Sequence, residues 1–262
     1  MNRDITATAN KVAEVTFLFW VIKILATTLG ETGGDALSMT MNLGYAVSTA
    51  IFGALFVGAV AAQIAARNFH PFLYWIVIVA TTTVGTTMAD FADRSLGIGY
   101  VGGSLGLLAL LMLTLGAWRL ALGSVAVDHI TSWKAEAFYW VTIVFSNTLG
   151  TALGDFFADD SGLGFLGAAA VFAGCLALIA AAYFFTKISR ELLFWAAFIL
   201  TRPLGATLGD LLTKSHDEGG LDLSRFGSTA IIALAMIGFI LFSARRSKSV
   251  RDQREEGSAF SK

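Results

Sequence analysis

The chain has 262 residues, of which 56% are hydrophobic and 14% charged, and its mean hydropathy is +0.70. Soluble domains contain about 45–50% apolar and about 25% charged residues, so a soluble protein is excluded and a multi-pass helical membrane protein is predicted. A net charge of −1 argues against a nucleic-acid partner, and the single cysteine, Cys175, excludes an intramolecular disulfide.

Along the chain, a polar N-terminus of residues 1–13 precedes four repeats and a polar tail. No small-residue cleavage signature follows this N-terminus, so no cleaved signal peptide is expected. The repeats are predicted at 14–66, 67–122, 123–187 and 188–243, with the tail at 244–262. We expect both the N-terminus and the tail to be cytoplasmic.

Each repeat opens with a segment that carries an aromatic–Trp pair, a glycine ten residues after the Trp, and an aspartate five residues further on. The repeated residues are Trp20, Trp75, Trp140 and Trp195; Gly30, Gly85, Gly150 and Gly205; and Asp35, Asp90, Asp155 and Asp210. All three sets step by 55, 65 and 55 residues, which indicates two halves that are each a duplicated pair. We interpret the tryptophans as interfacial anchors and the glycines as sites of close helix packing.

A second apolar run follows each of these segments, at about 43–66, 98–118, 163–185 and 226–243. The fourth run begins late, after an inserted polar loop, KSHDEGGLDLSR. Two helices per repeat give an all-α protein with eight transmembrane helices. Because two helices return the chain to the same side, the repeats are expected to be parallel, with pseudo-fourfold or nested twofold symmetry about the membrane normal.

The distribution of Lys and Arg sets the expected orientation. Thirteen of the 18 basic residues fall on the side of the two termini, including Arg3, Arg67 and the tail, whereas Arg94, Lys214 and Arg225 fall on the other side. The excess of basic residues marks the cytoplasmic side. Both termini are therefore expected in the cytoplasm, with the aspartates towards the outer face.

Tandem two-helix units with a marked tryptophan resemble the bacterial four-repeat proteins described as "uncharacterised membrane-anchored protein", whose repeat is a domain of unknown function. The resemblance covers about residues 14–243. It implies a bacterial inner-membrane protein of eight helices and assigns no activity.

A polar stripe runs along each motif segment, at positions −7, −3, +1 and +5 from the repeated glycine. These positions are four residues apart and share one helix face. Polar faces avoid lipid, so the four motif helices should surround a central axis. Besides the four aspartates, the stripe contains Lys23, Thr27, Glu31, Thr82, Thr86, Asn147, Thr151 and Arg202.

Glu31, Asp35, Asp90, Asp155 and Asp210 are predicted to bind a metal cation or protons, with the four aspartates at one depth around this axis. Oxygen ligands without Cys or His suit Mg²⁺, Mn²⁺ or Ca²⁺, and clustered carboxylates exchange protons readily. Lys23 and Arg202 are expected to tune these carboxylates, with Glu31 and Asp210 as their ion-pair partners. The remaining polar residues, Thr27, Thr82, Thr86, Asn147 and Thr151, would extend the substrate path.

The sequence thus predicts a secondary transporter of a small cation, with proton-coupled efflux of a divalent metal such as Mn²⁺ as the first hypothesis. Three alternatives stay open: a cation channel along the same axis, a transporter of an anion or small organic substrate held by Lys23 and Arg202, and a non-transporting scaffold or sensor. No enzyme signature is present, so no catalytic residue and no cofactor are predicted. The expected partners are the cation, protons and the bilayer, and the oligomeric state stays open.

Overall fold

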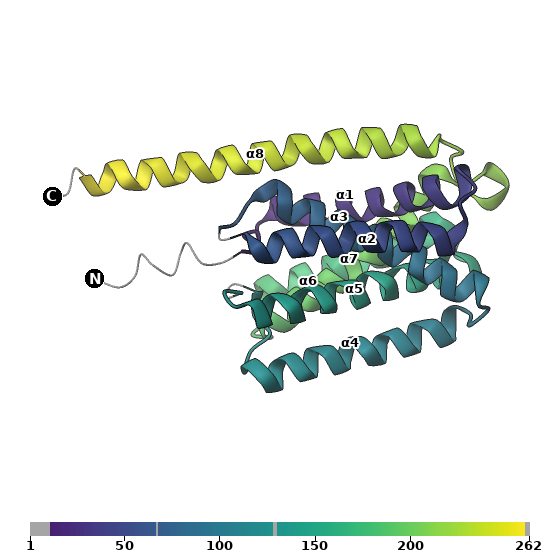
Figure 1. The fold of residues 1–262 in the computed structure, drawn as a ribbon, viewed down its shortest axis with the longest axis horizontal. Helices are drawn as coiled ribbons and strands as arrows, with labels where there is room; N and C mark the ends of the chain where they lie inside the picture. Colours follow the sequence, from purple (N-terminus) through teal and green to yellow (C-terminus); the bar gives the residue numbers. More distant parts are fainter. Residues whose placement is uncertain (1–10, 67, 128–129, 260–262) are drawn as a thin grey trace.

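The computed structural model describes residues 11–66, 68–127 and 130–259, with side chains as far as residue 246. Arg3, Arg67 and the first ten residues of the predicted N-terminus lie outside this part of the chain. Within it there are eight α-helices and no β-strand (Figure 1). The helices are α1 Phe17–Asp35, α2 Gly44–Ala65, α3 Pro71–Asp90, α4 Tyr100–Leu122, α5 Trp133–Asp155, α6 Gly164–Phe185, α7 Arg190–Thr213 and α8 Arg225–Ala259.

The helices that carry the repeated motif begin differently from the helices that follow them. Each motif helix (α1, α3, α5 and α7) starts at a residue whose side chain accepts a hydrogen bond from a backbone N–H of the first turn, namely Thr16, His70, Ser132 and Ser189. The helices α2, α4 and α6 start at or directly after glycines with φ of 75°, 77° and 66°: Gly44, Gly99 and Gly164. Only glycine adopts this left-handed region freely, so the repeated Gly–aromatic pairs mark where these helices begin.

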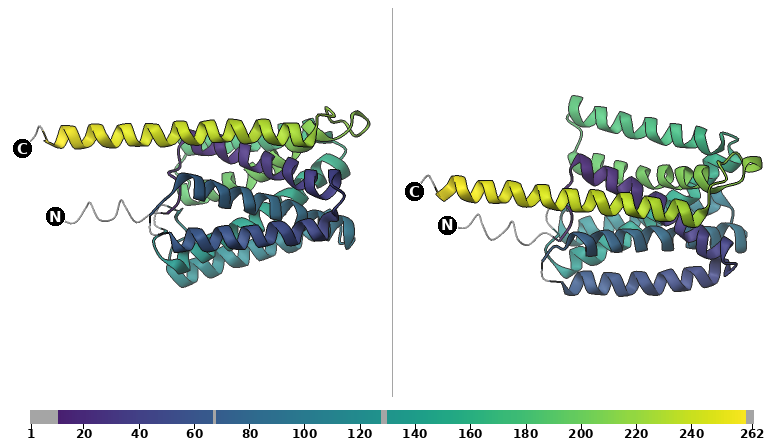
Figure 2. Two further views of the ribbon diagram at one scale, coloured as in Figure 1. Left: turned by 45° about the horizontal axis from the view of Figure 1, so that its top comes forward. Right: turned by 90° about the horizontal axis from the view of Figure 1, so that it is seen from above.

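The four motif helices form a closed ring in which α1 packs on α3, α3 on α5, α5 on α7 and α7 on α1. The other helices lie outside this ring, each mainly against the motif helix of the next repeat: α2 on α3, α4 on α5, α6 on α7 and α8 on α1. Figure 2 shows α8 running along the outside of the bundle and extending beyond the other helices.

The repeated glycines make the ring compact. Each glycine of one motif helix faces the −3 position of the next: Gly30 against Thr82, Gly85 against Asn147, Gly150 against Arg202, and Gly205 against Thr27. A Cβ at Gly30, Gly150 or Gly205 would overlap the side chain that the glycine faces, and a Cβ at Gly85 would lie only 3.0–3.1 Å from atoms of Asn147 and Thr148. The interpretation of the glycines as close-packing positions is thus confirmed.

Three of the four repeated tryptophans are not interfacial anchors. Trp75, Trp140 and Trp195 are buried. Each Trp packs against the aromatic residue of the preceding repeat's aromatic–Trp pair, with ring centroids 5.5, 5.9, 6.3 and 5.7 Å apart for Phe19–Trp75, Tyr74–Trp140, Tyr139–Trp195 and Phe194–Trp20. Mutual packing of the motif helices therefore removes these rings from the lipid interface, and the anchor prediction is wrong for the three buried tryptophans.

Seven helices are long and apolar enough to cross a membrane, as expected for a multi-pass membrane protein. About two thirds of the apolar window of α3, α5 and α7 is buried, against 11–22% for α2, α4, α6 and α8. The eighth helix, α1, is not among the seven; it spans 19 residues and carries Lys23, Glu31 and Asp35. The outer helices thus supply the apolar surface, and the motif helices enclose polar groups.

Candidate functional site

The four repeated aspartates lie where the motif helices end, and all are buried. In the first three repeats the helix changes at this point from α to π geometry, in the segments Ala36–Thr40, Phe91–Ser95 and Phe156–Asp160. Such π-helical turns are frequent at functional sites. In the fourth repeat α7 continues to Thr213, and the inserted loop, residues 214–225, follows.

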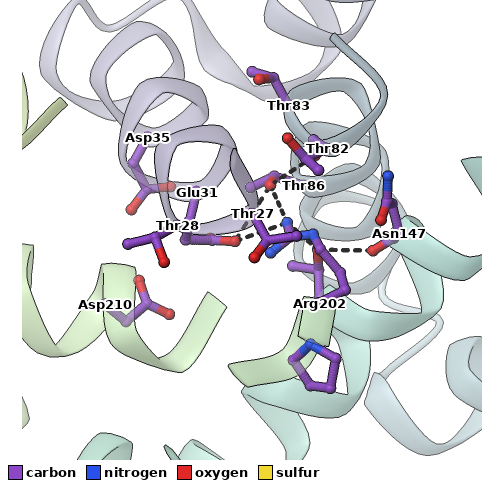
Figure 3. A network of polar contacts seen from close by, with 12 residues as sticks. Thr27, Thr28, Glu31, Asp35, Thr82, Thr83, Thr86, Asn147, Arg202 and Asp210 are labelled. Atoms are coloured by element: carbon purple, nitrogen blue, oxygen red, sulfur yellow. Dashed lines mark hydrogen bonds and ion pairs between the residues drawn. The ribbon is translucent and has the colours of Figure 1, made fainter. Parts of the chain in front are cut away.

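Asp35 and Asp210 form one pair, and Glu31 lies beside them (Figure 3). One carboxylate oxygen from each of the three residues lies within 4.8 Å of the others. The ammonium group of Lys214 lies 3.2 Å from Asp35 Oδ2 and 3.4 Å from Asp210 Oδ1. Arg225 Nε lies 3.7 Å from the same Asp35 oxygen. The two end residues of the inserted loop therefore both meet Asp35.

Asp90 and Asp155 form a second pair, which is held by Arg94. Its Nε lies 3.0 Å from Asp90 Oδ1, and its Nη2 lies 3.6 Å from both Asp155 Oδ2 and Asp159 Oδ2. The side chain of Arg94 is 34% exposed, against 8% for Lys214. The basic residue that bridges the second pair is thus more exposed to solvent than the one that bridges the first pair.

The four aspartates are therefore linked in two pairs, each bridged by a basic residue four positions after an aspartate. Lys214 follows Asp210, and Arg94 follows Asp90, at this spacing. The spacing was visible in the sequence, because residues at i and i+4 are neighbours on a helix. The sequence does not show that each basic residue also contacts the aspartate of the following repeat, Lys214 with Asp35 and Arg94 with Asp155.

Arg202 lies in the middle of the ring, deeper than the aspartates, since it occupies the −3 position of the stripe and they occupy the +5 position. Its Nη2 contacts Glu31 Oε2 at 2.9 Å, Thr151 Oγ1 at 2.7 Å, and the hydroxyl of Thr86. These partners come from α1, α5 and α3, so the guanidinium from α7 reaches all three other motif helices. The expected pairing of Arg202 with a carboxylate holds, with Glu31 as the partner (Figure 3).

The expected ion pair of Lys23 is absent from the described part of the chain. Its ammonium group donates to Asn147 Oδ1 at 3.4 Å and lies 4.2 Å from the ring centroid of Phe198. Lys23 is fully buried, and its level of the ring offers apolar side chains, Ile78, Ile143 and Phe198, in the other three motif helices. Along the stripe, Arg202 at position −3 thus lies between Lys23 at −7 and the carboxylates at +1 and +5.

Two of the proposed path threonines take part in helix packing. Thr27 Oγ1 contacts the carbonyl oxygen of Thr201 at 3.2 Å, and Thr82 Oγ1 contacts that of Ala26 at 3.1 Å. These contacts join α1 to α7 and α3 to α1. Asn147 donates through Nδ2 to Thr81 Oγ1 at 2.9 Å. The polar stripe therefore both faces the middle of the ring and ties its helices together.

The surroundings of Lys214 favour its positively charged form. Burial by itself lowers the pKa of Lys214, but the carboxylates of Asp210 and Asp35 outweigh burial, so the pKa is raised well above its ordinary value. The loop backbone holds this residue in place, since the Asp222 N–H donates to the Lys214 carbonyl oxygen at 2.9 Å.

Comparison with known proteins gives one assignment. No curated protein and no solved structure matches the chain. The family described as Repeat of Unknown Function (DUF347) matches four times, at residues 18–69, 73–123, 138–189 and 193–249, which together cover most of the chain and agree with the four repeats of the sequence. The chain therefore belongs to the DUF347 repeat family.

Proposed function

We propose that this protein is a secondary transporter of a small cation, with proton-coupled efflux of a divalent metal such as Mn²⁺ as the first hypothesis. The observation that carries the proposal is the convergence of Glu31, Asp35 and Asp210, whose carboxylate oxygens lie within 4.8 Å of one another in the buried end of the ring. Three hard oxygen donors at this separation suit a small divalent ion.

The proposed coupling to protons follows from the same carboxylates. Buried carboxylates close to one another do not all stay ionised unless cations neutralise them. A site that releases its metal ion must therefore take up protons or bring in basic side chains. The four aspartates and Glu31 would supply the exchangeable groups.

A carrier is favoured over an open channel by the position of Arg202. Its guanidinium contacts residues of the three other motif helices at one level, which leaves the middle of the ring filled there. An ion could pass only if this level rearranged, which is the behaviour expected of a carrier.

The proposed arrangement in the membrane is eight crossings by four parallel repeats, with pseudo-fourfold or nested twofold symmetry about the membrane normal. The cyclic contacts of the glycines and aromatic pairs support fourfold repetition. The two basic bridges, Arg94 and Lys214, occur in alternate repeats and support a nested twofold. We place the protein in the bacterial inner membrane, with both termini in the cytoplasm and the aspartates near the outer face.

Uptake of Mn²⁺ into liposomes under an imposed pH gradient tests the proposal. The wild-type protein should give saturable uptake, and Asp210→Asn should abolish it. Asp160→Asn is the matched control, because Asp160 is an exposed aspartate that follows Asp155 by five residues. Absence of wild-type flux with Mn²⁺, Mg²⁺ and Ca²⁺ would contradict the divalent-cation hypothesis.

A second candidate is transport of a small anion. Arg202 is fully buried, and its Nε and Nη1 have no hydrogen-bond partner among the described residues. Lys23 is an additional buried basic side chain without a carboxylate at ion-pair distance in that part of the chain. This candidate predicts that Lys23→Met abolishes flux of an anion such as chloride while Asp210→Asn has little effect on it.

A further inference from the structure

The inserted loop of the fourth repeat places a positive charge at each of its two ends beside the proposed cation site. Lys214 is the first residue of this loop, and Arg225 is both its last residue and the first residue of α8. Both contact the same oxygen, Asp35 Oδ2, at 3.2 and 3.7 Å. The other three repeats have a π-helical turn here in place of this loop.

The charges around this site balance in pairs. Glu31, Asp35 and Asp210 contribute three negative charges, and Arg202, Lys214 and Arg225 contribute three positive charges at ion-pair distances. Arg202 already contacts Glu31 and two threonines deeper in the ring. Lys214 and Arg225 thus compensate the two charges of the aspartate pair.

We propose that Lys214 and Arg225 are internal competitors of the transported ion, and that one divalent cation replaces both at Asp35 and Asp210. This inference rests on the proposed function and deepens it by naming the two basic side chains that a divalent substrate displaces. Exchange of two single positive charges for one double charge leaves the buried site neutral. A monovalent ion that replaced both side chains would leave one negative charge uncompensated in a buried position, which is costly.

The exchange requires side-chain movement and leaves the loop backbone in place. The loop is fixed by three backbone hydrogen bonds to the end of α7 and its C-cap, from Leu221, Asp222 and Leu223 to the carbonyl oxygens of Leu211, Lys214 and Leu212. Lys214 carries a flexible four-carbon stem with a point charge, which suits repeated release and return. The side chain of Arg225 is already 22% exposed, so water can solvate it when it leaves Asp35.

Calorimetric titration of the purified protein with Mn²⁺ alone tests the inference. Lys214→Met/Arg225→Met should bind Mn²⁺ about tenfold or more tightly than the wild type, because the competing side chains no longer reduce the fraction of binding-competent protein. Each single variant should lie between the two. Lys187→Met/Arg119→Met is the matched control, since it removes one Lys and one Arg from exposed positions at the opposite end, and it should bind as the wild type does.

A second measurement uses the unaltered protein and does not depend on how the variants fold. Lys214 is 7% exposed in this structure, so an amine-reactive reagent should modify it poorly. Addition of Mn²⁺ should increase its modification, measured by mass spectrometry, while the exposed Lys187 should react equally in both states.

The outcomes separate the inference from the proposed function. If the wild type binds Mn²⁺ but the double variant binds no more tightly, and Lys214 reactivity does not change, the inference is overturned and the proposed function stands. If neither wild type nor any variant binds Mn²⁺, both are overturned.

Discussion

Thr27 of the first repeat lies against Gly205 of the fourth, and this contact closes the ring of motif helices. A Cβ added to Gly205 would overlap the Thr27 side chain and lie 2.9 Å from its backbone carbonyl carbon. The same contact recurs between each pair of successive repeats. The ring therefore has four equivalent positions at which a glycine lets two helices approach closely.

Gly205→Ala should lower the stability of the protein, because α7 and α1 must separate to admit the methyl group. Overpacking of this kind costs about 1–3 kcal/mol, which should appear as a reduced midpoint of thermal unfolding in detergent. Gly58→Ala is the control: this glycine lies within α2 and a Cβ there would meet nothing within 4 Å. Equal midpoints for the two variants would contradict the account of the ring.

Arg202→Met should destabilise the protein strongly, because it leaves Glu31 as a buried carboxylate without its ion-pair partner. Removing one member of a buried pair costs about 3–5 kcal/mol. Glu31→Gln in the same chain removes the orphaned charge and should restore much of the stability. Thermal unfolding of the two single variants and the double variant measures this coupling, and purely additive losses would show that the pair does not act as a unit.

The helix α1 should cross the membrane although it is not among the seven helices that are long and apolar enough to do so by composition alone. In a Cys175→Ser background, cysteines introduced at Glu14→Cys and Met41→Cys stand on either side of α1, and both positions are exposed. A membrane-impermeant maleimide added to intact cells should label position 41 and should reach position 14 only after permeabilisation. Labelling of both positions from outside would show that α1 does not cross.

The sequence alone predicts the repeats, the polar stripe and the close-packing glycines. These features follow from local periodicity: residues four apart share a helix face, and a repeated Gly in an apolar segment indicates close helix contact. Glu31 and Arg202 were therefore placed in the middle of the ring from sequence alone. That Arg202 would pair with a carboxylate was expected because a buried charge needs a partner, but the choice of Glu31 over Asp210 was not.

The features that escaped prediction depend on which helices are neighbours. Sequence spacing places Lys214 beside Asp210, but its contact with Asp35 requires that α7 packs on α1. Likewise, Trp195 is buried because α4 and α5 cover it, and its indole N–H donates to the carbonyl oxygen of Val125 at 3.0 Å. Tertiary packing of this kind leaves no mark in the local pattern of a single repeat.

The most direct test of the central claim is a measurement of proton movement during Mn²⁺ transport, with a pH-sensitive dye enclosed in the proteoliposomes. Addition of Mn²⁺ outside should drive proton exit, and hence a rise of internal pH, with the wild type and with Asp160→Asn, but not with Asp210→Asn. If Mn²⁺ enters without any change of internal pH, or the pH change persists in Asp210→Asn, the carboxylates do not exchange protons for the metal ion and the account is contradicted.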